Sequence, residues 1–125
     1  MSASSPSTVL VVTNSDINIA KRFPAERVVF IGGKGEAEKL MNGRELVILE
    51  PGELTQRRLL ELLVALSSGV DQIIASCRAV EYSPVGEAIL AYVRIVDGLK
   101  ALIYGDCCKT LPILPGVECQ EVLLG

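Results

Sequence analysis

The chain has 125 residues and contains no histidine and no tryptophan. Without histidine it cannot form the Ser-His or Cys-His pairs that activate many nucleophiles, nor a histidine metal site. No other acid-base constellation is visible in the sequence. We therefore expect a protein that is not an enzyme and that has no catalytic residue and no cofactor.

Long apolar runs are also lacking. The apolar stretches of the chain are far shorter than the roughly 20 residues that cross a bilayer as a helix, so we expect no membrane partner. Residues 1–7 are polar and lack the apolar core of a signal peptide. We expect them to be a disordered N-terminus, and the protein to be cytoplasmic.

The chain carries no large excess of charge of one sign. It has 12 basic and 15 acidic residues, which give a net charge of −3. Affinity for nucleic acid or for an anionic membrane comes largely from neutralising phosphates with lysine and arginine. This balance disfavours a generic binder of either kind.

Amide side chains are scarce, since the chain has only three glutamines and three asparagines. Few thermolabile amides, together with four cysteines and no signal peptide, are typical of the cytosol of a hyperthermophile, where disulfides are tolerated. We therefore expect a hyperthermophilic source.

The cysteines are candidates for disulfides and not for a metal. They are Cys77, Cys107, Cys108 and Cys119. They lack Cys-x-x-Cys spacing, and adjacent Cys107 and Cys108 are awkward as ligands of one tetrahedral ion, so no metal is expected. If the last two strands form a hairpin, Cys107 or Cys108 can reach Cys119, within one chain or between two subunits.

Short β-branched apolar runs, each bounded by turn residues, predict six strands. They lie at Val9–Val12, Val28–Ile31, Leu46–Leu49, Ile73–Ser76, Leu99–Tyr104 and Val117–Leu124. Helices are predicted between them at Asp16–Phe23, Lys34–Asn42, Leu54–Ser67 and Pro84–Val96, the last with Ser83 as its N-cap. The order β-α-β-α-β-α-β-α-β-β predicts an α/β or α+β fold, a mixed sheet packed by helices.

The two longer predicted helices are apolar on nearly all sides. A helix of this kind is buried on more than one side, and a small domain has little of its own to cover it. We expect a second subunit as the cover, in a homodimer or with a heteromeric protein partner. The alternative is that the N-terminal forty residues cover these helices within one chain.

A family resemblance rests on apolar and turn positions in the C-terminal two-thirds of the chain. The positions are Leu46–Leu49, Leu59, Leu60, Leu63, Leu66, Gly69–Ile74, Arg78, Ser83 and Gln120–Leu124. In them the chain resembles the Alba family of small archaeal chromatin and RNA-binding proteins, which includes RNase P-associated subunits. The resemblance implies a β-α-β-α-β-β module at residues 45–125 and a β/α extension at residues 8–44, in one compact domain. It also implies nucleic-acid contacts from Arg57, Arg58 and Arg78, although Arg57 and Arg58 are equally placed for local pairing with Glu53 and Glu61.

The same stretch departs from the family where the family is basic. The loop Glu50–Leu54 is acidic, Val80 stands in place of a second arginine, and residues 106–116 hold one lysine. Residues 45–125 contain six basic and eleven acidic residues, a net charge of −5. We therefore expect a divergent Alba-like protein that binds RNA or DNA weakly, or that joins a nucleoprotein complex through protein contacts.

Two short motifs favour an alternative function. Gly32-Gly33-Lys34 follows a predicted strand and opens a helix, where backbone N–H groups can approach a phosphate. Asn14–Asp16 follows the first strand, at the end where open parallel sheets bind ligands. The alternative is a Rossmann-like domain that binds a small phosphorylated ligand there. The plainer interpretation of the two motifs is a tight strand-helix turn and a helix cap. A third alternative is a structural scaffold subunit whose apolar helical faces dock a partner. The order of the strands in the sheet discriminates between the Alba-like and the Rossmann-like topology.

Overall fold

A computed structural model describes residues 7–22, 25–38, 43, 45–66, 70–110 and 115–120. Its strands are β1 (Thr8–Thr13), β2 (Arg27–Ile31), β3 (Glu45–Leu49), β4 (Gln72–Ser76), β5 (Lys100–Tyr104) and β6 (Val117–Gln120). Its α-helices are α1 (Ile17–Arg22), α2 (Lys34–Ala37), α3 (Gln56–Leu66), α4 (Cys77–Val80) and α5 (Ser83–Ile95). Short 3-10 helices lie at η1 (Asn14–Asp16), η3 (Pro51–Glu53) and η4 (Asp106–Lys109).

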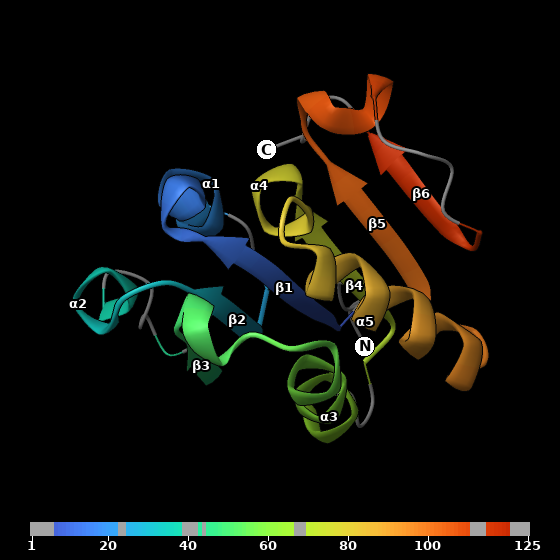
Figure 1. The fold of residues 1–125 in the computed structure, drawn as a ribbon, viewed down its shortest axis with the longest axis horizontal. Coiled ribbons are helices and arrows are strands. Elements are labelled where there is room, and N and C mark those ends of the chain that lie inside the picture. The colour runs from blue at the N-terminus through green and yellow to red at the C-terminus, as the bar shows by residue number, and fades with distance from the viewer. Residues whose placement is uncertain are drawn as a thin grey trace, which may run out of the picture.

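The six strands form one sheet in the order β3-β2-β1-β4-β5-β6, and each pairs with its neighbours in parallel (Figure 1). The predicted α/β class is confirmed. Two details of that prediction are wrong: the sheet is parallel and not mixed, and the last two strands are not a hairpin. The chain between β5 and β6, residues 105–116, is about as long as the dozen residues that a parallel crossover needs, so β6 can return in the same direction.

The N-terminal segment lies in the middle of the sheet. The Alba resemblance implied a self-contained module from residue 45 onward, with residues 8–44 appended to it. In the sheet, β1 and β2 lie between β3 and β4, so the two segments share one set of hydrogen-bonded strands. This connectivity differs from the one that the Alba resemblance implied. It is the doubly wound arrangement expected for the Rossmann-like alternative.

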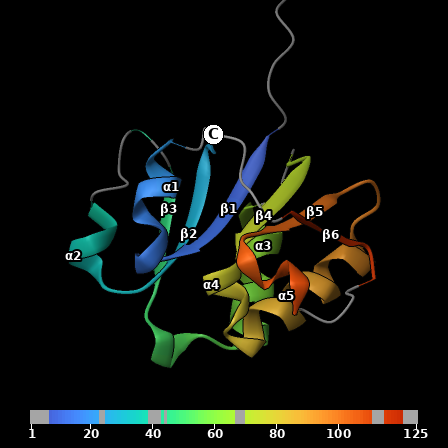
Figure 2. The same ribbon diagram turned by 90° about the horizontal axis from the view of Figure 1, so that it is seen from above.

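Helices cover the sheet on two faces. Side chains of α3 and α5 pack against one face, with Leu59, Leu63 and Tyr92 buried among them. On the other face Ala20 of α1 and Ala37 of α2 are buried against Leu10 and Phe30 of the sheet. Figure 2 shows the two helix pairs on opposite sides of the strands. Strands buried on both faces are continuously apolar, which is the pattern of Val9–Val12 within β1.

The N-terminal strands also cover the apolar helices within the chain. Val9 and Val11 of β1 and Val29 of β2 belong to the same buried cluster as α3 and α5. Two apolar side chains of these helices remain more than half exposed, Val64 at 52% and Ile95 at 63%. A second subunit on this surface stays a prediction.

The ends of several elements differ from the sequence expectation. Helix α5 begins at Ser83 with Tyr82 as its N-cap residue, so Ser83 lies in the first turn and is not the cap. Helix α4 was not expected, because four residues show no periodicity. The N–H of Ser7, just before β1, donates a hydrogen bond to Asp71 Oδ2 at 3.1 Å. The predicted parts at residues 1–6, 39–42 and 121–124 lie outside the described residues.

No helix in the described part of the chain is long and apolar enough to cross a membrane.

The hydroxyl of Tyr92 generates a prediction about stability. Tyr92 is fully buried in the α3–α5 cluster, and within the described part of the chain its hydroxyl has no hydrogen-bond partner. Because an unpaired buried hydroxyl is destabilising, we expect Tyr92→Phe to raise the free energy of unfolding by about 1 kcal/mol. Urea unfolding measures the change. Tyr82→Phe, at an exposed ring, is the matched control and should change stability little, and a loss of stability in Tyr92→Phe would contradict the prediction.

Candidate functional site

The sheet order places a crevice at the carboxyl ends of β1 and β4. From β1 the chain proceeds to β2 and β3 on one side, and later returns to β4, β5 and β6 on the other side. The connections that leave β1 and β4 therefore diverge, and ligands of open parallel sheets bind at such a switch point. A cleft of about 320 Å³ lies there. It is lined by Thr13, Asn14, Ser15, Arg78, Glu81 and Tyr82.

Asp16 ties the two walls of the cleft together. It is only 6% exposed, and its Oδ2 accepts hydrogen bonds from Thr13 N and Thr13 Oγ1, both at 3.0 Å. The same oxygen accepts a hydrogen bond from Ser76 Oγ at 2.5 Å, across 60 residues of sequence. A buried carboxylate needs such partners, because its desolvation is otherwise very unfavourable. The position of one wall relative to the other is thus fixed at the base of the loops.

Ser76 also holds the start of α4, which forms the second wall of the cleft. Its Oγ accepts a hydrogen bond from Ala79 N at 3.0 Å and so caps α4. The residues that follow, Arg78, Glu81 and Tyr82, form that wall. Arg78 and Glu81 are 3.9 Å apart and about two-thirds exposed, which makes them a weak, solvent-screened ion pair.

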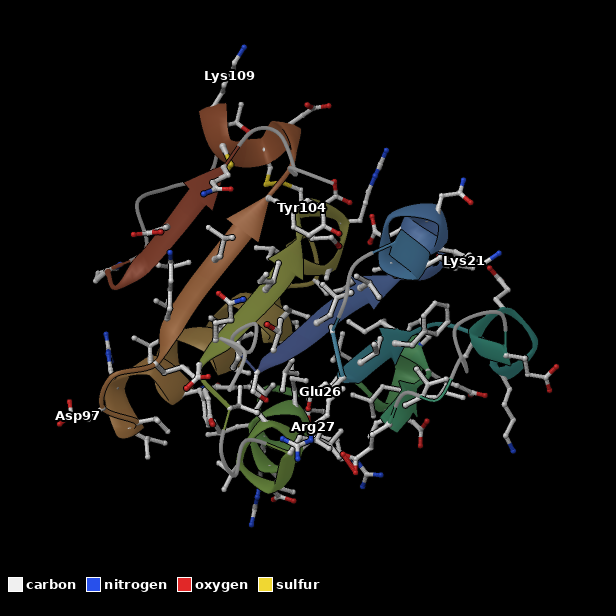
Figure 3. The ribbon with its side chains drawn as sticks, turned by 180° about the vertical axis from the view of Figure 1, so that it is seen from behind. Lys21, Glu26, Arg27, Asp97, Tyr104 and Lys109 are labelled. Atoms are coloured by element: carbon white, nitrogen blue, oxygen red, sulfur yellow. A yellow bond between two sulfur atoms is a disulfide. The ribbon has the colours of Figure 1, made fainter. Side chains whose placement is uncertain are left out.

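Tyr104 lies at the same end of the sheet, paired in register with Ser76 (Figure 3). It is 3% exposed, and its hydroxyl has no hydrogen-bond partner among the residues that the structure describes. Burial, and secondly the negative charge of Asp16, raise the pKa of Tyr104 well above its ordinary value. The phenol is therefore neutral at every physiological pH.

Two disulfides connect α4, η4 and β6 next to the cleft. Cys77, the first residue of α4, bonds to Cys107 of η4, and Cys108 of η4 bonds to Cys119 of β6. The Cα–Cα distances of 5.7 and 5.5 Å are ordinary for disulfides. The predicted disulfides are confirmed, and the pairing of Cys108 with Cys119 is one of the two that the sequence allowed.

A glycine makes room for the bond nearest the cleft. Gly105 has a φ of +128°, and a Cβ placed on it would lie 2.8 Å from Cys77 Sγ and 3.0 Å from Cys77 Cβ. Cys107 N also donates a hydrogen bond to Cys77 Sγ at 3.2 Å. The end of β5 is thus wrapped closely around this sulfur.

The predicted Gly32-Gly33-Lys34 motif lies beside the cleft and does not line it. Gly32 has a φ of +156°, and a Cβ on it would lie 2.8 Å from the Phe30 ring and 3.6 Å from Asn14 Cβ. The Gly32 N–H donates to Leu49 O at 3.0 Å, so it holds β3 and is not directed at a ligand. Lys34, in the first position of α2, is exposed to solvent.

The three arginines predicted to contact nucleic acid belong to two different elements. Arg57 and Arg58 lie in the first turn of α3, and Arg57 pairs with Glu61 at 3.2 Å. Arg78 lies on α4 and lines the cleft. Arg57 is paired with Glu61 and Arg78 with Glu81, as expected for spacings of four and three residues.

Sequence reasoning found one wall of the cleft and missed most of the other. Thr13, Asn14 and Ser15 belong to the motif after the first strand, but Glu81 and Tyr82 were not proposed. The available signal was the polar run Ser76-Cys77-Arg78, which ends an apolar strand in the same way as Thr13-Asn14-Ser15.

Among the residues that the structure describes, no group of three or more cysteine or acidic side chains could hold a metal ion. All four cysteines are in disulfides.

The chain matches no protein-family model, and no curated protein is significantly similar to it in sequence.

The pKa of Tyr104 predicts how stability depends on pH. Its pKa is raised in the folded state and near 10 in the unfolded state, so its contribution is complete below about pH 10 and is lost as the pH rises further. We expect the wild type to lose up to about 1.4 kcal/mol per pH unit above that point through this group. Urea unfolding at several pH values should show a shallower alkaline limb in Tyr104→Phe. An unchanged limb would contradict the prediction, and Tyr82→Phe is the control.

Gly105 gives a second prediction. An alanine there adds a Cβ against Cys77 and must adopt a left-handed backbone, so we expect Gly105→Ala to destabilise the fold by about 2 kcal/mol or more. Gly52→Ala is the matched control, because nothing lies within 4 Å of a Cβ at that position. Thermal unfolding and a free-thiol assay report the result. Equal stability of the two variants would show that the packing around Cys77 is loose.

Proposed function

We propose that this protein binds a small phosphorylated ligand, of the nucleotide type, in the cleft between η1 and α4. The observation that carries the proposal is the coincidence of a polar cleft with the switch point of a doubly wound parallel sheet. Crevices at this position of open α/β sheets are where ligands bind, because the loops on the two sides separate there. A volume of about 320 Å³ lies at the small end of the range for ligand sites.

The chemistry of the lining favours an anionic group. Asn14 and Ser15 offer an amide and a hydroxyl from one wall, and Arg78 offers the guanidinium from the other. A guanidinium presents a planar set of donors that fits the oxygens of a phosphate. Since the pair that Arg78 forms with Glu81 is long and exposed, turning Arg78 toward a ligand should require little free energy.

Tyr82 favours a ligand that carries a ring as well as a phosphate. Its side chain lines the cleft next to Arg78 and is 38% exposed, so part of the ring faces solvent. An aromatic face of this kind supports stacking of a planar base. Glu81 can accept hydrogen bonds from hydroxyl or amino groups of the same ligand. A nucleotide combines these features, whereas inorganic phosphate would use neither Tyr82 nor Glu81.

Calorimetric titration with ADP, AMP and inorganic phosphate tests this function. We expect ADP to bind, and Arg78→Gln to weaken its binding by about tenfold or more, because the variant loses a charge-assisted hydrogen bond. Arg57→Gln is the matched control, since Arg57 is also an exposed arginine paired with a glutamate, but it lies outside the cleft. Lys34→Gln should have a smaller effect, because Lys34 does not line the cleft.

The result can contradict the proposal in two ways. If neither nucleotides nor phosphate bind, the cleft is not a phosphate site. If Arg78→Gln and Arg57→Gln weaken binding equally, the anion is attracted by general charge and not by the cleft. A single-stranded RNA oligonucleotide in the same titration tests the Alba-like alternative, which requires that RNA bind and that both arginine variants weaken it.

A further inference from the structure

We propose that the Cys77–Cys107 disulfide is a redox switch for ligand binding in this cleft. The cleft binds its ligand when the bond is formed, and its affinity for the ligand falls when a dithiol reduces the bond. The inference rests on the proposed function and adds a means of regulation to it. It is carried by the way in which α4, the wall that holds Arg78, is attached to the rest of the molecule.

Helix α4 depends on its attachments because it is only four residues long. So short a helix is unstable alone, since nucleation fixes several residues for a single hydrogen bond. At its start it has two tethers. One is the chain of hydrogen bonds from Asp16 through Ser76 Oγ to Ala79 N, and the other is the covalent bond from Cys77 to η4.

The Cys77–Cys107 disulfide lies in a closely packed region, so its two sulfurs need more space once the bond is broken. Bonded sulfurs lie about 2 Å apart, whereas non-bonded atoms pack at about 3.5–4.0 Å. The space around Cys77 Sγ is already limited by Gly105, whose missing Cβ would lie 2.8 Å from that sulfur. On reduction the two sulfurs therefore move apart, and η4 no longer holds the start of α4 covalently. Arg78 is the next residue along the chain, so the displacement reaches the cleft directly.

The chemistry is a two-electron exchange. A dithiol supplies two electrons and two protons, the Cys77–Cys107 bond breaks to give two cysteine thiols, and the dithiol becomes a disulfide. Both sulfur-bearing residues are half-buried and not fully enclosed, so a small reductant can reach them. Exchange with a small-molecule disulfide reverses the reaction: that disulfide takes up the two electrons and two protons of the Cys77 and Cys107 thiols, becomes two thiols itself, and the Cys77–Cys107 bond forms again.

The second disulfide, Cys108–Cys119, is a matched control for the first. Cys108, the neighbour of Cys107 in η4, forms the other disulfide with the exposed Cys119 of β6. That bond attaches η4 to the edge of the sheet, and neither of its residues lines the cleft. Removing one bond or the other changes the number of disulfides equally, but only one of them anchors α4.

The experiment compares C77S/C107S with C108S/C119S by calorimetric titration with ADP. We expect C77S/C107S to bind about tenfold more weakly or worse, because the competent arrangement of α4 becomes a minor population, and C108S/C119S to stay within about twofold of the wild type. Dithiothreitol should weaken binding to C108S/C119S, which keeps only the bond at the cleft, and reoxidation should restore it. Equal effects of the two double variants would overturn the proposal.

Hydrogen exchange supplies a readout that needs no ligand. Loss of the Cys77–Cys107 bond should speed exchange of the amides of residues 77–82 by about tenfold or more, while β1 stays protected. Unchanged exchange in residues 77–82 would overturn the switch, as would simultaneous exposure of β1, which would make the bond a requirement for folding. If the oxidised wild type does not bind ADP, phosphate or AMP, the proposed function itself fails, and the exchange data then report the movement of α4 separately.

Discussion

The burial of β1 is the constraint on which the rest of this structure depends. All of its residues, Thr8–Thr13, are buried, and it is hydrogen-bonded to β2 on one edge and to β4 on the other. A parallel strand in this position must be covered on both faces, which places α1 and α2 on one side and α3 and α5 on the other. Because β1 is central, the chain adds β2 and β3 on one side of it and later adds β4, β5 and β6 on the other side. The cleft is thus a consequence of the packing, since it opens where the two sets of connections part.

Several parts of this arrangement are readable from the sequence. Strands β1 to β5 coincide with the short apolar runs, and β6 overlaps the start of the predicted run Val117–Leu124. The polar residues after the first strand, Asn14 and Ser15, do line the cleft. Strand direction is less readable, because it depends on connection geometry. The link from Gly105 to Gly116 shows no helical pattern and so favoured a hairpin, although it is just long enough for a parallel crossover. The continuous apolarity of the strands was the better signal, since it is typical of parallel sheets.

The rest of the site could not be predicted, because it is made by contacts between distant segments. Ser76 donates to Asp16 across 60 residues of sequence, and Cys77 bonds to Cys107 only because β4 and β5 are neighbours. Neither pairing leaves a local pattern. The sequence did limit the partner of Cys119 to Cys107 or Cys108, but it did so through a hairpin that the structure does not have. The Alba resemblance used apolar positions that suit any buried strand or helix, so it carried information about elements and little about their order.

The two disulfides lie where the fold has least secondary structure to stabilise it. Between β5 and β6 the described chain has only η4 in place of a crossover helix, and β6 is a short strand whose last three residues are exposed. A covalent bond from η4 to β6 holds this edge, and a second bond from the adjacent residue of η4 continues inward to α4. The 3-10 helix η4 therefore connects the disulfide at the edge of the sheet with the disulfide next to the cleft. Cys77 directly follows the last residue of β4 and directly precedes Arg78, so the bond to η4 is attached where the sheet meets the wall of the cleft.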